Sequence, residues 1–298
     1  MRKLVLVFAV MLFILSVVAC TTVPTSSGTS IPTSATTTQA GPPRPPLTVQ
    51  YCGDVTTSYP RADLQGANEL IASSLIDAVS ANQQGVTLYV TKISHNSFDP
   101  INTLYPAFIV PTIPGYPAAP TPVPTFPPEN PVFDGQTATA VRNQTDQAIQ
   151  QYNQTVASIG QTVQNDRSAV SLDVNKRLIG WDPAPENSGS SVLGCLAAAA
   201  SRFQGQTGDK LLYIASDLEN TTDVDFEQTL VAQRQLSGSI VHVIYFYSPT
   251  AAQDQAKRAL WCPYFKAAGA TSVTFDLPGQ IYSQDLFDSD RQPHQSQC

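Results

Sequence analysis

The sequence predicts an α/β fold with a doubly wound, mostly parallel sheet that has helices on both faces. Five runs rich in apolar and β-branched residues are strand-like, and most are apolar at nearly every position. Segments with helical spacing of apolar residues separate them. Apolar strands that alternate with helices are typical of a parallel sheet buried on both faces. The strand-like runs are 47–52, 86–93, 211–216, 240–246 and 272–275, and the helical segments between them are 62–80, 226–236 and 254–268.

Residues 1–20 precede the fold and have the layout of a secretory signal peptide. Arg2 and Lys3 are followed by the apolar residues 4–18 and the small residue Ala19. Residues 15–20 resemble the lipobox of bacterial lipoproteins. That resemblance implies cleavage before Cys20, attachment of lipid (palmitate among the acyl chains) to Cys20, and a lipid-anchored protein that faces outside the cytoplasm on a bacterial cell membrane.

Residues 21–46 consist mainly of Thr, Ser and Pro and carry a single charge, Arg44. Such a segment has no apolar surface to bury, so we expect a disordered linker between the membrane and a globular head. The head is expected to span 47–288, with a short tail at 289–298.

Residues 95–187 interrupt the alternation of strands and helices and are expected to be an insertion. Prolines and aromatic residues are dense in 106–131, where 107–110 has the character of an edge strand and the rest that of a surface loop. This loop either docks a partner or packs on its own aromatics. Residues 138–178 then carry apolar residues alternately three and four apart, which predicts a long helix with Gly160 as a point of kinking. The helix either packs on the sheet or serves as an arm for self-association.

Four cysteines remain once Cys20 is assigned to the lipid anchor: Cys52, Cys195, Cys262 and Cys298. An even number outside the cytosol predicts two disulfides, and three pairings are possible. The preferred pairing joins Cys262 to Cys298, which would hold the terminal tail, and Cys52 to Cys195.

The net charge is −7 and only 13% of residues are charged. An acidic, sparsely charged protein is a poor match for a nucleic-acid partner. No glycine-rich phosphate loop or nucleophile elbow is present, and the three histidines are scattered, so no catalytic activity is expected. Of these, His242 lies in an apolar strand and is expected to be a core residue rather than a ligand.

Oxygen-bearing side chains follow the predicted strands at their carboxyl ends, where parallel sheets bind ligands. Asp54, Thr56 and Ser58 alternate in the turn after the first strand, Ser190 stands in a turn before an Ala-rich helix, and Asp217 directly follows a central strand. Oxygen ligands suit a hard divalent cation such as Mg²⁺, with Mn²⁺ or Ca²⁺ as alternatives. The same residue types also cap helices and satisfy turn amides without metal, and that reading stays open.

In this order the three groups resemble the metal-ion-dependent adhesion site of von Willebrand factor A-type domains, and the resemblance covers about residues 47–276. It implies that Asp54, Thr56, Ser58, Ser190 and Asp217 hold the cation, and that an acidic side chain of a protein partner completes its coordination. Leu218 stands where the family usually has glycine, which puts the shape of that turn in question. The alternative function is that of a structural component of an envelope complex, acting without metal through the long helix and the Pro-rich loop.

Overall fold

The computed structural model describes most of the head. The described residues are 46–81, 85–112, 120, 135–187, 189–221, 230–277 and 298. Several predicted features lie outside them: the signal peptide, the linker up to residue 45, most of the Pro-rich loop, the first four residues of the predicted helix 226–236, and the tail up to residue 297.

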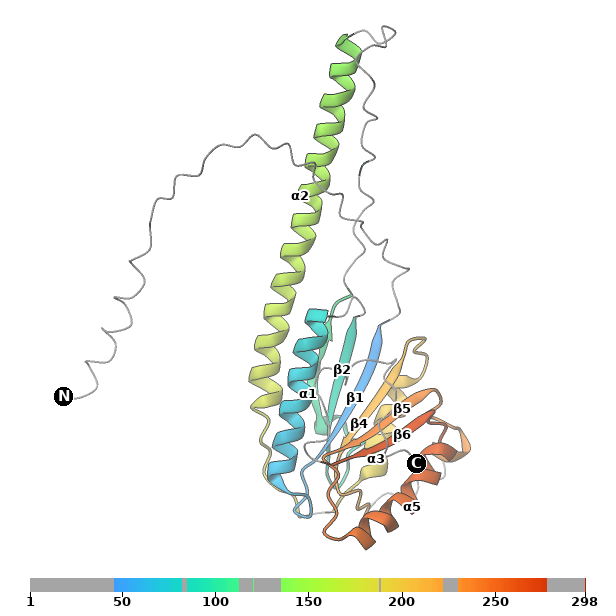
Figure 1. Ribbon diagram of the computed structural model, residues 1–298. Coiled ribbons are helices and arrows are strands. Elements are labelled where there is room, and N and C mark those ends of the chain that lie inside the picture. Colours follow the sequence, from blue (N-terminus) through green and yellow to red (C-terminus); the bar gives the residue numbers. More distant parts are fainter. Residues whose placement is uncertain are drawn as a thin grey trace, which may run out of the picture. The chain divides into compact units, whose positions relative to one another are not determined.

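The core of the head is a six-stranded sheet with the strand order β3-β2-β1-β4-β5-β6 (Figure 1). All neighbouring strands are parallel except β3, which is antiparallel to β2 at one edge. Chain order reverses between β1 and β4, so the sheet is doubly wound with a switch point at that pair. The predicted fold class is therefore confirmed. The strands are β1 (Leu47–Asp54), β2 (Val86–Ile93), β3 (Thr103–Val110), β4 (Lys210–Ala215), β5 (Ser239–Ile244) and β6 (Ser272–Asp276).

The predicted edge strand is longer than the sequence indicated, because β3 begins at Thr103 and includes Pro106. Proline lacks a backbone N–H and is tolerated in a strand that has a neighbour on only one side. Position at the edge therefore allows a strand where proline content alone argued for a loop.

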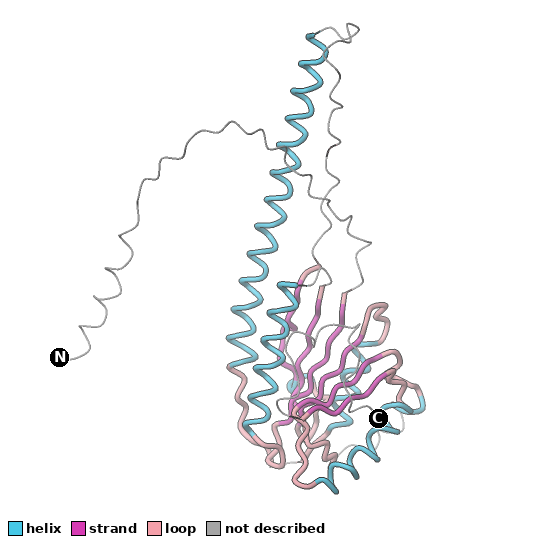
Figure 2. The backbone as a smooth tube through the Cα atoms, viewed as in Figure 1, coloured by secondary structure: helices cyan, strands magenta, loops and turns pink. Residues whose placement is uncertain are grey.

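Helices cover both faces of the sheet, as the backbone view in Figure 2 shows. One apolar core joins α1 and the end of α2 to one face, and a second joins α3 and α5 to the other. The helices are α1 (Arg61–Ala81), α2 (Gly135–Val174), α3 (Val192–Phe203) and α5 (Ala251–Ala267), with a π-helical turn η2 (Asn175–Ile179) and a 3₁₀ turn η1 (Pro100–Asn102). None of the helices in the described part of the chain is long and apolar enough to cross a membrane.

Helix α2 runs without interruption through Gly160, so the predicted kink is not present. A methyl group added at Gly160 would meet no atom within 4 Å, which means that nothing packs closely there. Glycine in a helix costs about 1 kcal/mol relative to alanine, which lowers helix stability but does not end a helix. At its C-terminal end, Val174 and the following Leu178 are fully buried in the core beside α1.

Two disulfides are present, and both match the preferred pairing. Cys52–Cys195 joins β1 to α3, and Cys262–Cys298 joins α5 to the last residue of the chain. His242 is a core residue, as expected: it is 4% exposed, stacks on Tyr213, and its Nδ1 lies 2.7 Å from the hydroxyl of Thr274.

Candidate metal site

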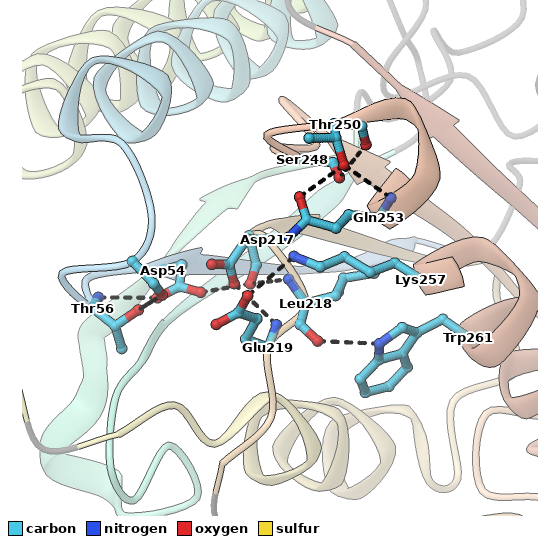
Figure 3. A network of polar contacts seen from close by, with 12 residues as sticks. Asp54, Thr56, Asp217, Leu218, Glu219, Ser248, Thr250, Gln253, Lys257 and Trp261 are labelled. Carbon is cyan, nitrogen blue, oxygen red and sulfur yellow. Dashed lines mark hydrogen bonds and ion pairs between the residues drawn. The ribbon is translucent and has the colours of Figure 1, made fainter. Parts of the chain in front are cut away.

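Asp54 is the last residue of β1, and the turn after it folds back onto its carboxylate. The backbone N–H and the hydroxyl of Thr56 both donate to Asp54 Oδ1, at 3.0 and 2.7 Å (Figure 3). The hydroxyl oxygens of Thr56 and Ser58 lie 3.2 Å apart. An Asp side chain that accepts from the amide two residues later is a common turn-forming contact. The alternation in sequence therefore brings these three oxygen-bearing side chains together, as predicted.

A short parallel bridge to Glu186 holds the turn that follows β1. Thr56 pairs with Glu186, the amide of Thr57 donates to Glu186 O at 3.1 Å, and the amide of Glu186 donates to Val55 O at 2.9 Å. The Glu186 carboxylate in turn accepts from Lys92 Nζ at 2.7 Å. The end of the inserted segment thus pairs with the turn after β1, beside the site.

The turn after β4 contacts Asp54 directly through Ser216. Its hydroxyl donates to Asp54 Oδ2 at 2.5 Å and accepts from the amide of Leu218 at 2.9 Å. The next residue, Asp217, accepts from the amide of Glu219 at 2.9 Å. The sequence places Ser216 at the end of a central strand, beside Asp217, but Ser216 was not among the residues assigned to the site, and its contact with Asp54 was missed.

Leu218 adopts the left-handed backbone conformation, with φ 58°, which glycine adopts most readily. Its side chain is buried, and its carbonyl oxygen accepts from Trp261 Nε1 of α5 at 3.1 Å. The turn therefore closes without glycine, because burial and two backbone hydrogen bonds hold a conformation that costs a leucine about 1–2 kcal/mol.

Ser190 lies before α3 and is hydrogen-bonded to Thr221, in the segment that follows β4. Its amide donates to Thr221 Oγ1 at 2.8 Å, and its carbonyl accepts from the amide of Thr221 at 2.9 Å. The adjacent Ser191 caps α3 by accepting from the amide of Gly194 at 3.1 Å. These contacts place Ser190 between the N-terminus of α3 and the segment that follows Asp217.

The two carboxylates are buried, with Asp54 1% and Asp217 2% exposed. None of the ion pairs within the described residues involves either of them. Burial raises the pKa of Asp54 to about 6, against hydrogen bonds from Ser216 and Thr56 that lower it, and the negative charge of Asp217 raises it further. The site therefore brings together two buried carboxylates, and no cationic side chain in the described part of the chain forms an ion pair with either.

A lysine stands near this edge, on α5. Lys257 Nζ lies 3.6 Å from Glu219 Oε1, and Figure 3 shows its side chain reaching toward the turn that carries Asp217. The ion pair that Lys257 forms is therefore with the exposed Glu219 and not with either buried carboxylate.

The donor set fits a hard divalent cation. It consists of two carboxylates and three hydroxyl groups, all of them oxygen ligands of the kind that Mg²⁺ and Ca²⁺ take. Within the described ranges no three His, Cys, Asp or Glu side chains gather closely enough to hold a metal. A cation here would accordingly depend on hydroxyls and water for most of its coordination.

A cavity in the described part of the head lies away from this site. It measures about 460 Å³ and lies around the C-terminal half of α3, lined among others by Ala200, Gln204 and Lys210. Lys210 is the first residue of β4, whereas Asp217 follows the last one. The cavity therefore lies near the amino ends of the parallel strands, and the candidate site lies at their carboxyl ends.

Comparison with known proteins finds solved structures that are similar to this chain, but it does not assign the chain to a family. No family model matches the chain, and no curated protein matches it in sequence. Among solved structures it is similar to von Willebrand factor type A from Catenulispora acidiphila, at 11% identity and a TM-score of 0.39 over 82% of this chain and 40% of that one. It is also similar to the human COPII-coat protein Sec24c, at 11% identity and a TM-score of 0.30 over 76% and 32% of the two chains. The chain thus spans less than half the length of either protein, and similarity at these TM-scores carries no argument about function. The α/β fold class rests on the sheet order itself, which is consistent with a von Willebrand A-like fold.

Proposed function

We propose that the head binds a divalent cation, preferably Mg²⁺, and through it an acidic side chain of a protein partner. The observation that carries the proposal is the pair of buried carboxylates, Asp54 and Asp217, at adjacent strand ends with no ion-paired lysine, arginine or histidine among the described residues. Burying a charge is costly unless an opposite charge or a metal compensates it. A bound cation would supply that compensation.

The neighbouring hydroxyls would then complete the coordination. Thr56 and Ser58 extend from the turn after β1, and Ser190 lies beside the N-terminus of α3. Hydroxyl and water ligands donate little negative charge, so the cation would stay electrophilic and would attract a carboxylate from outside. The resemblance to the adhesion site described above supports this reading of the open coordination position.

Binding, rather than catalysis, is the activity proposed for this edge of the sheet. Among the described residues, the side chains that hydrogen-bond to Asp54 are the hydroxyls of Thr56 and Ser216, which donate to it, and none is a histidine. Activated nucleophiles are recognised by a nearby general base, which these contacts do not supply.

Titration calorimetry of the purified protein with MgCl₂, MnCl₂ and CaCl₂ tests the cation proposal. We expect one site, and loss of binding in Asp54→Ala and in Asp217→Ala. Asp209→Ala, which removes an exposed carboxylate just before β4, is the matched control and should bind as the unaltered protein does. Absence of binding by the unaltered protein, or unchanged binding in Asp54→Ala, would overturn the proposal.

The lipid anchor is a second part of the proposed function. We propose that Cys20 carries lipid, that residues 21–46 act as the linker, and that the head faces the outside of a bacterial cell membrane. Labelling of the expressed protein with radioactive palmitate should give a signal that Cys20→Ala abolishes. A label that persists in Cys20→Ala would contradict this assignment.

The alternative, a structural role in an envelope complex, draws support from a different surface. Most of α2 before Val170 is exposed or half-exposed, including Ile149, which is 39% exposed. This surface does not include any residue of the candidate metal site, so the two functions are separable by substitution.

A further inference from the structure

The apolar stripe of α2 continues well beyond the part that packs on the head. At the C-terminal end, Val170 and Val174 lie against the core beside α1. Toward the N-terminus the stripe goes on with residues that recur four and three positions apart. We name these six residues the α2 seam: Thr145, Ile149, Tyr152, Val156, Ile159 and Val163.

The length of α2 explains why the seam extends past its neighbour. Forty residues at 1.5 Å per residue give a helix of about 60 Å, and the 21 residues of α1 give about 32 Å. Since α1 contacts α2 near η2, where both are buried in one core, it covers only the C-terminal part of the stripe.

The seam has the repeat of a two-stranded coiled coil. Spacing that alternates between three and four keeps one narrow stripe on the same side of the helix and fits a partner helix with the same repeat. Residues 147–165 contain no charged side chain. The surface is therefore suited to a helix of the same character, and α2 of a second copy supplies one.

We propose that two copies of this chain pair through the α2 seam in an antiparallel arrangement. In this register Ile149 faces Ile159 of the second copy, Tyr152 faces Val156, and Thr145 faces Val163. The proposal does not depend on the metal site.

Charges at the two ends of the seam favour this orientation. The heptad positions before Thr145 and after Val163 are Arg142 and Asp166. In the antiparallel register Arg142 of each copy faces Asp166 of the other, so the pair occurs twice. In a parallel pair, Arg142 would face Arg142 and Asp166 would face Asp166, and like charges at facing positions are destabilising.

The position of the head relative to the α2 seam also favours an antiparallel pair of helices. The stripe faces α1 and β3 at its C-terminal end, so each head lies on the seam side of its own α2. Two parallel helices joined at their seams would direct both heads into one space. An antiparallel pair carries the heads at opposite ends.

The expected affinity is modest. Five of the six seam side chains are only half-exposed and Ile149 is 39% exposed, so the area that pairing buries is at or below the lower end for specific interfaces. A concentration-dependent monomer–dimer equilibrium is therefore expected, and a shared membrane anchor would shift it toward the dimer by raising the local concentration.

Analytical ultracentrifugation of the full chain in detergent tests the pairing. We expect dimers whose fraction rises with concentration, and a dissociation constant at least about tenfold higher in Ile149→Asp and in Val156→Asp. Gln154→Asp, which places the same charge outside the seam in the uncharged stretch, is the matched control and should leave dimerisation unchanged. A chain that stays monomeric up to about 100 μM, or equal effects of Gln154→Asp and Val156→Asp, would overturn the proposal.

Two further measurements test the orientation. Arg142→Asp and Asp166→Arg should each weaken the dimer, and the double variant should restore it. A mixture of Ile149→Cys and Ile159→Cys chains should form a disulfide between the two variants, whereas neither should crosslink with itself. Crosslinking of Ile149→Cys with its own kind would show a parallel pair and refute the arrangement.

Discussion

Replacing Asp54 by asparagine should make the metal-free protein more stable at neutral pH, although the residue is almost fully buried. In the folded protein the pKa of Asp54 is raised to about 6 from 3.8, mainly because burial disfavours the charged form. A tenfold change in proton affinity corresponds to about 1.4 kcal/mol. Ionised Asp54 therefore costs the folded state about 3 kcal/mol at pH 7, and asparagine removes that cost.

The sign of the pH dependence follows from the direction of the shift. Because its pKa is higher in the folded state, Asp54 binds a proton more tightly there than in the unfolded chain. The free energy of unfolding of the unaltered protein should thus fall by about 3 kcal/mol as the pH rises from 3.8 to above 6. This contribution should be absent in Asp54→Asn.

Hydrogen bonding reduces the net gain. Asparagine keeps an oxygen to accept from Thr56, but its amide must donate to Ser216, whose hydroxyl now donates to Asp54. Reversal of that bond costs about 1 kcal/mol. The net expectation at pH 7 is a stabilisation of about 2 kcal/mol, or a rise in Tm of about 4–8 °C for a domain of this size.

Urea unfolding in EDTA, followed at pH 4 and pH 7, measures this effect. Asp209→Asn is the control, because it removes an exposed carboxylate just before the amino end of β4. It should change the free energy of unfolding little at either pH. A loss of stability in Asp54→Asn at pH 7 would refute the argument that the ionised carboxylate destabilises the folded state. Saturating Mg²⁺, at about 100 times its Kd, should add about 2.7 kcal/mol to the unaltered protein and nothing to Asp54→Asn.

Three further predictions concern the turn at Leu218, the disulfides and Arg202. Leu218→Gly should be less destabilising than Leu218→Ala, by about 1 kcal/mol in urea unfolding. Both variants lose the buried side chain, but alanine keeps the strain of the left-handed backbone, which glycine relieves. The reverse order of stability would contradict the assigned strain. Replacing both Cys262 and Cys298 by serine opens a loop of 36 residues and should lower the free energy of unfolding by about 4 kcal/mol. Replacing both Cys52 and Cys195 by alanine opens a loop of 143 residues and should lower it by about 5 kcal/mol. Chemical unfolding of the two double variants checks this order. Arg202→Met should cost about 2–3 kcal/mol, because the Arg202 guanidinium donates to Gln50, Thr91 and Thr103. Methionine would remove these three bonds and leave the buried Gln50 Oε1 without the donor it has now, whereas the two threonine hydroxyls can still bond to each other. Equal stability in a thermal melt would contradict that role.

The sequence was sufficient to predict five strands and a mostly parallel sheet, because buried parallel strands are apolar along nearly their whole length. It was less informative for β3, where Pro106 suggested a loop and the position at a sheet edge permitted a strand. It also predicted a kink at Gly160 that is absent, because a helix of this length tolerates one exposed glycine.

For the candidate site, spacing predicted which residues approach one another but not what connects them. Asp54, Thr56 and Ser58 lie together as their alternation requires. The bond from Ser216 to Asp54 joins residues far apart in the chain, so only the tertiary structure could reveal it. The same is true of Thr221, which fixes the backbone of Ser190.

The Cys52–Cys195 disulfide has a consequence for how a cation would meet this head. Cys52 stands two residues before Asp54, and Cys195 five residues after Ser190, so one covalent bond limits the separation of two corners of the site. A cation entering there would not have to draw β1 and α3 together, and the free energy that such ordering consumes would be available for binding. Formation of that bond would then help to make the head competent to bind a cation.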